Sequence, residues 1–189
     1  MRVIAGKAKG RPVLFPAKSK DRPTADRIKE ALFNILSPLD GKIFLDICAG
    51  SGNIGIEALS RGAIHAAFIE KESILVEHIR RNLAHCGFTG QYEILAMDMK
   101  RAILQLQKKE AHFDVIFADP PYETGLVHEI CQALAKGKLF TKEGILVIQH
   151  SVREEPEWQR EERFQLVDQR KYGDTRLTFL KCRERDEDL

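Results

Sequence analysis

A regular alternation of short apolar runs with amphipathic segments narrows the folds open to this sequence. Five runs rich in β-branched and aromatic residues predict strands at 43–47, 65–69, 92–96, 113–118 and 145–149. Apolar residues at helical spacing between them predict helices near 53–61, 72–86, 99–109 and 125–137. The runs Phe-Asp-Val-Ile-Phe-Ala and Ile-Leu-Val-Ile are almost continuously apolar, which is typical of parallel strands covered by helices on both faces. The pattern therefore predicts a doubly wound α/β fold with a mostly parallel sheet.

The two ends of the chain extend this alternation. A further helix is predicted before the first strand, with Thr24 as its N-cap, Pro38 after its end, and Ile28, Leu32, Ile35 and Leu36 on one face. After His150, strand-like runs at 164–170 and 176–180 predict a closing antiparallel pair, which brings the sheet to seven strands. We expect residues 184–189 to form a frayed tail.

The net charge of +2 conceals an uneven distribution along the chain. Residues 1–29 hold nine basic and two acidic side chains, a net charge of +7, and the other 160 residues carry −5. Because phosphate contacts depend on clustered Lys and Arg, this distribution favours a polyanionic partner over a merely solvated tail. Apolar residues interleaved with the charges predict a basic β-hairpin extension at 1–22, followed by one main domain at 23–183.

Length and composition exclude several classes of protein. At 189 residues the core needs no metal or disulfide staple. No window approaches ~18 consecutive apolar residues, so we expect a cytoplasmic protein without membrane contact. The widely spaced Cys48, Cys86, Cys131 and Cys182 are expected to be reduced, mostly buried thiols. The six histidines lack metal-ligand spacing, so we predict no metal, and nothing in the sequence demands more than a monomer.

A glycine loop lies directly between the first predicted strand and the helix that follows it. Gly50, Gly52 and Gly55 match the GxGxxG pattern, in which glycine permits close approach of a ligand and dihedrals that other residues resist. Glu70 ends the second predicted strand, where an acid can bind ribose hydroxyls. The context on both sides of the loop favours a nucleoside ligand.

Four acidic residues distinguish between nucleoside ligands. Asp46, Glu70, Asp98 and Asp119 fall at or just beyond the carboxyl ends of the first four strands, where ligands of such sheets bind. Two like charges at ~4 Å repel by several kcal/mol in a partly buried site, so an anionic pyrophosphate fits poorly among these carboxylates. S-adenosylmethionine carries a sulfonium and an ammonium, and is the predicted cofactor. The alternative for some of these acids, above all Asp98, is that they only cap the following helix.

The segment after the fourth strand, Asp119-Pro120-Pro121-Tyr122, resembles the signature of methyltransferases that act on planar exocyclic amines. The lone pair of such an amine is delocalised into its ring. Acceptors from the Asp119 carboxylate and the Pro120 carbonyl could bind its two N–H groups and favour the geometry and positive charge of attack. Pro120 and Pro121 stiffen the loop, and Tyr122 offers an aromatic face for a flipped base. These four residues are the predicted catalytic residues.

Several further segments narrow the resemblance to the RsmD family, which methylates N2 of a guanine in bacterial 16S ribosomal RNA. They are 2–11, 22–34, the glycine loop continued through Glu57-Ala58-Leu59-Ser60-Arg61-Gly62-Ala63, and Lys171-Tyr172-Gly173-Asp174-Thr175. The resemblance covers nearly the whole chain and implies a Rossmann-like class I methyltransferase. It departs from the family at Cys48, where an aromatic residue is common, and at Asn53, where members vary.

The resemblance also implies roles for individual residues. The methionine part of the donor would contact Asp46, Ala49, Gly50, Ser51, Gly52 and Asn53, and the nucleoside part Glu70, Lys71, Asp98 and Met99. The residues implied to contact RNA, within an assembled small ribosomal subunit, are Arg2, Lys7, Lys9, Arg11, Arg22, Thr24 and Arg27.

Four alternatives stay open at this stage. The four-residue signature does not choose among guanine N2, adenine N6 of DNA or RNA, and a glutamine amide of a protein, although the basic extension disfavours a protein substrate. A ribosome-assembly protein without catalysis and a nicotinamide-dependent oxidoreductase are the alternatives from other classes. The intact Asp119 and glycine loop argue against the assembly protein, and GxGxxG alone supports the oxidoreductase.

Overall fold

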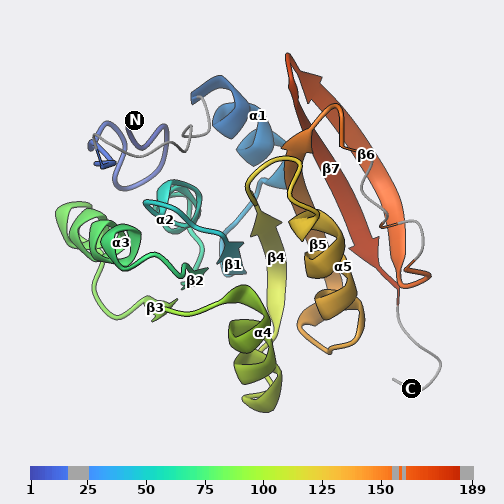
Figure 1. The fold of residues 1–189 in the computed structure, drawn as a ribbon. Coiled ribbons are helices and arrows are strands. Elements are labelled where there is room, and N and C mark those ends of the chain that lie inside the picture. Colours follow the sequence, from blue (N-terminus) through green and yellow to red (C-terminus); the bar gives the residue numbers. More distant parts are fainter. Residues whose placement is uncertain (17–25, 155–157, 159–160, 184–189) are drawn as a thin grey trace. The chain divides into compact units, whose positions relative to one another are not determined.

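The computed structural model describes residues 1–16, 26–154, 158 and 161–183 (Figure 1). The chain divides into two compact units, Met1–Asp98 and Met99–Leu189. The predicted α/β class with seven mostly parallel strands is confirmed. In the described part of the chain, no helix is both long enough and apolar enough to cross a membrane.

The first unit holds three parallel strands in the order β3-β2-β1. They are β1 (Ile43–Ile47), β2 (His65–Ile69) and β3 (Tyr92–Leu95), joined by helices α2 (Asn53–Ser60) and α3 (Ser73–His85). Ile47 pairs with Ile69, so β1 and β2 end at the same level. The residues that follow the two strands are therefore brought to one edge of the sheet, as predicted for parallel strands.

The second unit holds α4 (Met99–Lys108), β4 (Phe113–Ala118), α5 (Leu126–Ala135), β5 (Phe140–Ser151), β6 (Phe164–Tyr172) and β7 (Thr175–Cys182). β4 and β5 are parallel, and β7 lies antiparallel between β5 and β6. β5 begins five residues before the predicted strand at 145–149. The segment Thr-Lys-Glu-Gly has the composition of a turn, and it forms an irregularity within β5, because Phe140 pairs with Phe113 and Ile145 already pairs with Val115. Glu143 of this segment forms an ion pair with Lys181 at 2.6 Å.

Helix α1 (Asp26–Leu36) buries a different face from the predicted one. Leu32 and Leu36 are buried as expected, but Ile35 is 41% exposed and Lys29 is fully buried. The sequence prediction was wrong here because it excluded a lysine from the core. Pro38 follows the helix as predicted, whereas Thr24 lies outside the described residues.

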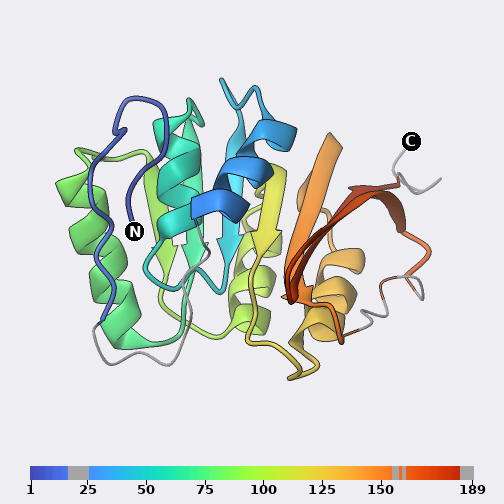
Figure 2. The same cartoon turned by 90° about the horizontal axis from the view of Figure 1, so that it is seen from above.

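Residues 1–16, here called the N-terminal arm, lie beside α2 and α3 (Figure 2). The predicted β-hairpin is not confirmed, because the arm holds only an isolated antiparallel bridge between Arg2 and Pro12. Its apolar residues Val3, Ala8 and Val13 are buried. The boundaries at 22 and 184 stay predictions, since residues 17–25 and 184–189 lie outside the described residues.

The predicted state of the cysteines is confirmed. None of the four is in a disulfide, and Cys86, Cys131 and Cys182 are buried. Burial raises the pKa of the Cys131 thiol to about 12, so this group stays protonated at neutral pH.

Candidate functional site

The loop after β1 has a backbone shape that glycine makes possible. Gly50 and Gly52 have φ values of 57° and 81°, in the left-handed region that favours glycine. Cys48, with φ 60°, adopts the same conformation without that freedom, which is a form of strain common at functional sites. The loop is also tied to the next strand, because the Gly50 N–H donates to the Glu70 carboxylate at 2.9 Å.

Gly55, the third glycine of the pattern, allows α2 to pack closely against β2. A Cβ at this position would lie 2.3 Å from Cε1 of Phe68, a fully buried ring on β2. Glycine therefore lets α2 approach the sheet closely, as the third glycine of this motif does in related folds.

We expect Gly55→Ala to lower the free energy of unfolding by about 2–3 kcal/mol, because the added methyl group overpacks the space beside Phe68. Chemical denaturation measures this loss. In the double variant Gly55→Ala/Phe68→Leu, the smaller leucine side chain leaves room for the added methyl group. Phe68→Leu should therefore cost less stability in the Gly55→Ala background than it does in the wild type. Strictly additive losses would show that the two side chains do not meet.

Two acidic residues flank the glycine loop. The Asp46 carboxylate, 1% exposed, accepts the N–H of Gly55 at 2.9 Å and so joins the end of β1 to the first turn of α2. Glu70 accepts the N–H groups of Gly50 and Glu72 at 2.9 and 3.0 Å. Burial raises the pKa of Glu70, and these backbone donors counter the shift. Hydroxyl donors of a ligand would restore part of the solvation that the Glu70 carboxylate has lost.

Asn53, the first residue of α2, carries a buried polar atom that lacks a partner. Its Oδ1 accepts a hydrogen bond from Lys29 Nζ at 2.7 Å. An ammonium group only donates, so this contact fixes the amide with Nδ2 on the other side. Nδ2 is buried and has no hydrogen-bond partner among the described residues. Such a donor fits the carboxylate of an amino-acid ligand, and together with Glu70 it makes the loop suited to S-adenosylmethionine.

The remaining predicted cofactor residues have mixed environments. Ala49 and Ser51 are buried within the loop, and Lys71 is exposed directly after Glu70. Asp98 is exposed directly before α4, and Met99 is the buried first residue of that helix. The first unit thus brings Asp46, the glycine loop and Glu70 together.

The loop after β4 belongs to the second unit. Asp119 is half-buried, Pro120 is buried, and Pro121 and Tyr122 are exposed. The Tyr122 hydroxyl lies 3.0 Å from Thr175 Oγ1 and accepts a weak hydrogen bond from Gln149 Nε2 at 3.4 Å. Burial raises the pKa of Tyr122, and the nearby Asp119 charge adds to the shift, so the phenol stays protonated.

Sequence reasoning missed the two residues that hold Tyr122. Thr175, the first residue of β7, lies in the segment Lys171-Tyr172-Gly173-Asp174-Thr175, which entered only as part of the family resemblance. Gln149 is a buried polar residue directly after the apolar run Ile-Leu-Val-Ile of β5. A polar residue within the predicted strand at 145–149 was the available signal for it.

The described residues predicted to contact RNA are on the surface. Arg2, Lys7, Lys9, Arg11 and Arg27 are all exposed, whereas Arg22 and Thr24 lie outside the described residues. Arg11 is held in place, since its Nη1 donates to the His85 carbonyl at 2.6 Å. The buried Lys29 was counted in the basic segment but contributes no charge to this surface.

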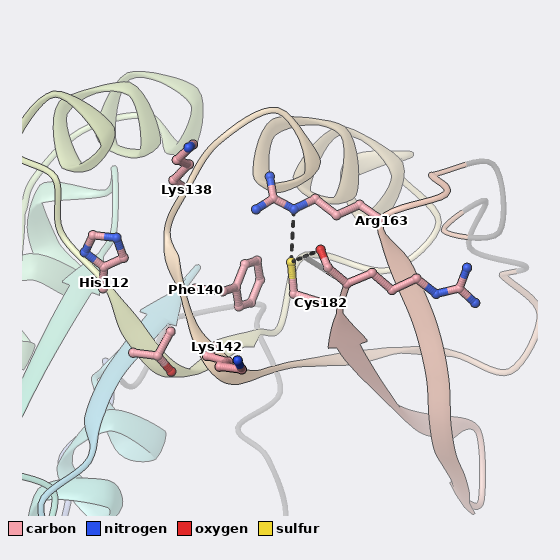
Figure 3. A pocket seen from close by; sticks show the side chains of 8 residues that line it. His112, Lys138, Phe140, Lys142, Arg163 and Cys182 are labelled. Atoms are coloured by element: carbon pink, nitrogen blue, oxygen red, sulfur yellow. Dashed lines mark hydrogen bonds between the residues drawn. The ribbon is translucent and has the colours of Figure 1, made fainter. Parts of the chain in front are cut away.

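A separate pocket of about 310 Å³ lies where β4 and β5 begin (Figure 3). Lys138, Lys142, Arg163 and Arg183 contribute to its lining. The Arg163 guanidinium donates to the carbonyl of Ala135, the last residue of α5, to the carbonyl of Gly137 just after it, and to Cys182 Sγ at 3.1 Å. This arginine therefore satisfies backbone groups at a helix end, which is a structural role.

Comparisons with known proteins agree with the fold. A family model described as "Conserved hypothetical protein 95" matches residues 1–181. Ribosomal RNA small subunit methyltransferase D of Escherichia coli is 33% identical over 154 residues, covering 80% of this chain and 75% of that protein. The putative rRNA methyltransferase YlbH of Bacillus subtilis is 36% identical over 151 residues, covering 79% and 82%.

A solved structure matches over nearly its whole length. The putative methyltransferase yhhF from Escherichia coli superposes with a TM-score of 0.84 at 27% identity, covering 98% of this chain and 99% of that chain. The fold and the glycine loop define the class, a methyltransferase of the Rossmann-like type. Within this class the chain belongs to the Conserved hypothetical protein 95 family, which is the RsmD family that its motifs resembled.

Proposed function

We propose that this protein transfers a methyl group from S-adenosylmethionine to the exocyclic N2 of a guanine in 16S ribosomal RNA, within the small ribosomal subunit. The observation that carries the proposal is the Asp119-Pro120-Pro121-Tyr122 loop, with its tyrosine held by Thr175 and Gln149, in a chain of this family. Relatives named as ribosomal RNA small subunit methyltransferases and the exposed cations of the arm support an RNA substrate.

The residues around the glycine loop would bind the donor. Asn53 Nδ2 would donate to its carboxylate, Glu70 would accept the ribose hydroxyls, and Asp46 would attract its ammonium group. The donor supplies a methyl group made electrophilic by the sulfonium. Carboxylates near this cation lower the cost of removing it from water.

The loop after β4 would bind the acceptor. Asp119 and the Pro120 carbonyl would accept the two N–H groups of the guanine amine and favour the charge that develops as it attacks. The new N–C bond would form as the methyl group leaves the donor sulfur, and the amine would then release a proton to Asp119 or to water. No covalent enzyme intermediate and no strong base are required.

Tyr122 would stack on the guanine. Because stacking of one base on an aromatic side chain contributes roughly 1–3 kcal/mol, we expect Tyr122→Ala to raise the KM for RNA about tenfold or more. Tyr122→Phe keeps the ring and loses only the contacts of the hydroxyl with Thr175 and Gln149, so a change of about two- to threefold is expected. Steady-state kinetics on purified small subunits measures both. Equal KM values for wild type and Tyr122→Ala would rule out stacking.

Mapping of modified nucleosides in ribosomal RNA tests the assigned product. RNA from cells that lack this protein should be missing one N2-methylguanine in 16S ribosomal RNA, and expression of the wild-type protein should restore it. Loss of N6-methyladenine instead would transfer the proposal to adenine. An unchanged set of modified nucleosides would refute RNA methylation by this protein.

A further inference from the structure

The N-terminal arm is built onto the first unit through buried polar groups as well as apolar ones. The fully buried Glu57 carboxylate of α2 accepts the N–H groups of Ile4 and Ala5 at 2.7 and 3.0 Å. Ser60, at the end of the same helix, accepts the N–H of Ala8 through its Oγ at 2.9 Å, and its carbonyl accepts the N–H of Lys7. The arm is therefore held in one position on α2 by its contacts with Glu57 and Ser60, and this position is here called its seat.

Gly6 is required for this seat. It has a φ of 81°, and a Cβ added there would lie 1.7 Å from the Ser60 carbonyl oxygen. The atom it would meet belongs to backbone, so the clash can be relieved only by moving the arm away from α2.

The first connection from the arm to the glycine loop runs through Asn82 of α3, which is fully buried. Its Oδ1 accepts the Leu14 N–H at 2.9 Å. Its Nδ2 donates to the carbonyls of Leu14 and Ser51 at 2.8 and 3.0 Å. A single side-chain amide thus joins the arm to a residue between the two left-handed glycines.

The second connection runs through Lys29 of α1. Its buried ammonium donates to the Arg2 carbonyl of the arm at 2.6 Å and to Asn53 Oδ1 at 2.7 Å. It also lies 3.4 Å from Glu57 Oε2. The bond to Asn53 is the one that leaves Nδ2 of this amide pointing away from Lys29.

A third contact is apolar. The Phe15 ring lies 4.0 Å from the position that a Cβ on Gly50 would occupy, so the end of the arm lies beside this glycine. The arm is thus linked to the loop at three residues: at Gly50 through Phe15, at Ser51 through Asn82 and at Asn53 through Lys29.

We propose that the N-terminal arm helps to position the donor site. Asn82 and Lys29 are the positioning residues that couple the arm's contacts with α2 to the conformation of the glycine loop. If the arm leaves its seat, both buried side chains lose arm partners, and burying a polar group without a partner is costly. The loop then rearranges, and the donor-binding form becomes less populated. This inference rests on the proposed function, because it assigns the loop to S-adenosylmethionine.

Two matched glycine variants in the arm test the inference. Gly6→Ala should push the arm away from Ser60, the last residue of α2. The glycine loop precedes the other end of this helix. Gly10→Ala adds the same methyl group at φ 84° with nothing within 4 Å. We expect Gly6→Ala to weaken the binding of S-adenosylhomocysteine about tenfold in isothermal titration, within the usual range of coupling between sites, and Gly10→Ala to change it less than about twofold.

Amide hydrogen exchange of the wild-type protein tests the same coupling without a substitution. Adding S-adenosylhomocysteine should slow exchange at Ile4, Ala5 and Leu14, whose N–H groups bond to Glu57 and Asn82. Unchanged exchange at these amides under saturating ligand, or wild-type affinity in a Gly6→Ala protein whose arm amides have lost protection, would overturn the inference. Failure of the wild type to bind the ligand at all would refute the proposed function itself.

Discussion

Asp119→Ala should lower the turnover number for methyl transfer by about 100-fold or more and change the affinity for S-adenosylmethionine only a few-fold. The expected loss is large because the carboxylate would accept an N–H of the amine and oppose its developing positive charge. Donor affinity should persist because the donor contacts assigned to Asn53 and Glu70 are unaltered. Single-turnover assays on small subunits, paired with titration of the donor, separate the two quantities.

Asp114→Ala is a suitable control for Asp119→Ala. Asp114 is also on β4, near the start of the strand, where it accepts a hydrogen bond from Thr141 at 3.2 Å. Removal of the Asp114 charge should leave the turnover number within about twofold of the wild type. Asp114 and Asp119 lie at opposite ends of β4, and salt screens the interaction of charges that are so far apart. Turnover like that of the wild type in Asp119→Ala would contradict the role assigned to this residue.

Glu57→Ala should lower the free energy of unfolding by about 3–5 kcal/mol, because it removes the counter-charge of a fully buried lysine. The same carboxylate accepts a hydrogen bond from Arg61 Nε at 2.7 Å and two from the arm. Urea denaturation monitored by circular dichroism measures the change. A loss below about 1 kcal/mol would show that the network contributes little.

Lys29→Met should be tolerated better than Glu57→Ala. The Glu57 carboxylate keeps Arg61 and the two arm N–H groups in this variant, so we expect a loss of about 1–3 kcal/mol. Equal losses in the two variants would contradict this asymmetry.

The stability conferred by Lys29 should also depend on pH. Burial lowers the pKa of Lys29 in the folded protein below its usual value. Between the folded and unfolded pKa values the unfolded chain binds more protons, so the stability of the wild type relative to Lys29→Met should rise with pH in that window. Below the folded pKa the difference should be flat.

The strands could be predicted closely because their apolar runs are local signals. β1, β2 and β4 begin and end at the predicted residues. β5 was predicted too short because Lys142, Glu143 and Gly144 look like a turn. These residues form an irregularity within β5 itself, since five steps along β5 match two along β4, and sequence pattern alone does not reveal that the strand resumes on both sides of it.

The residues of the candidate site could be proposed from their types and positions in the sequence, but the polar contacts that hold them in place could not. Lys29 was counted only as one of the basic residues of 1–29, because no local pattern shows that Glu57 and Asn53 would surround its ammonium group. Asn82 could not be singled out from the sequence, because it lies in an ordinary amphipathic helix. Its side-chain amide nevertheless joins Leu14 to Ser51. Such contacts depend on the packed fold, which periodicity predicts only in outline.

Transfer of an isotopically labelled methyl group tests the central claim most directly. Purified protein, S-adenosylmethionine with a trideuterated methyl group, and small subunits from cells that lack the protein would be combined, and the RNA digested to nucleosides for mass spectrometry. The account predicts labelled N2-methylguanosine from 16S ribosomal RNA with the wild type, and at least about 100-fold less with Asp119→Ala. Label on adenosine or protein, or no label with a wild-type protein that binds the donor, would contradict it.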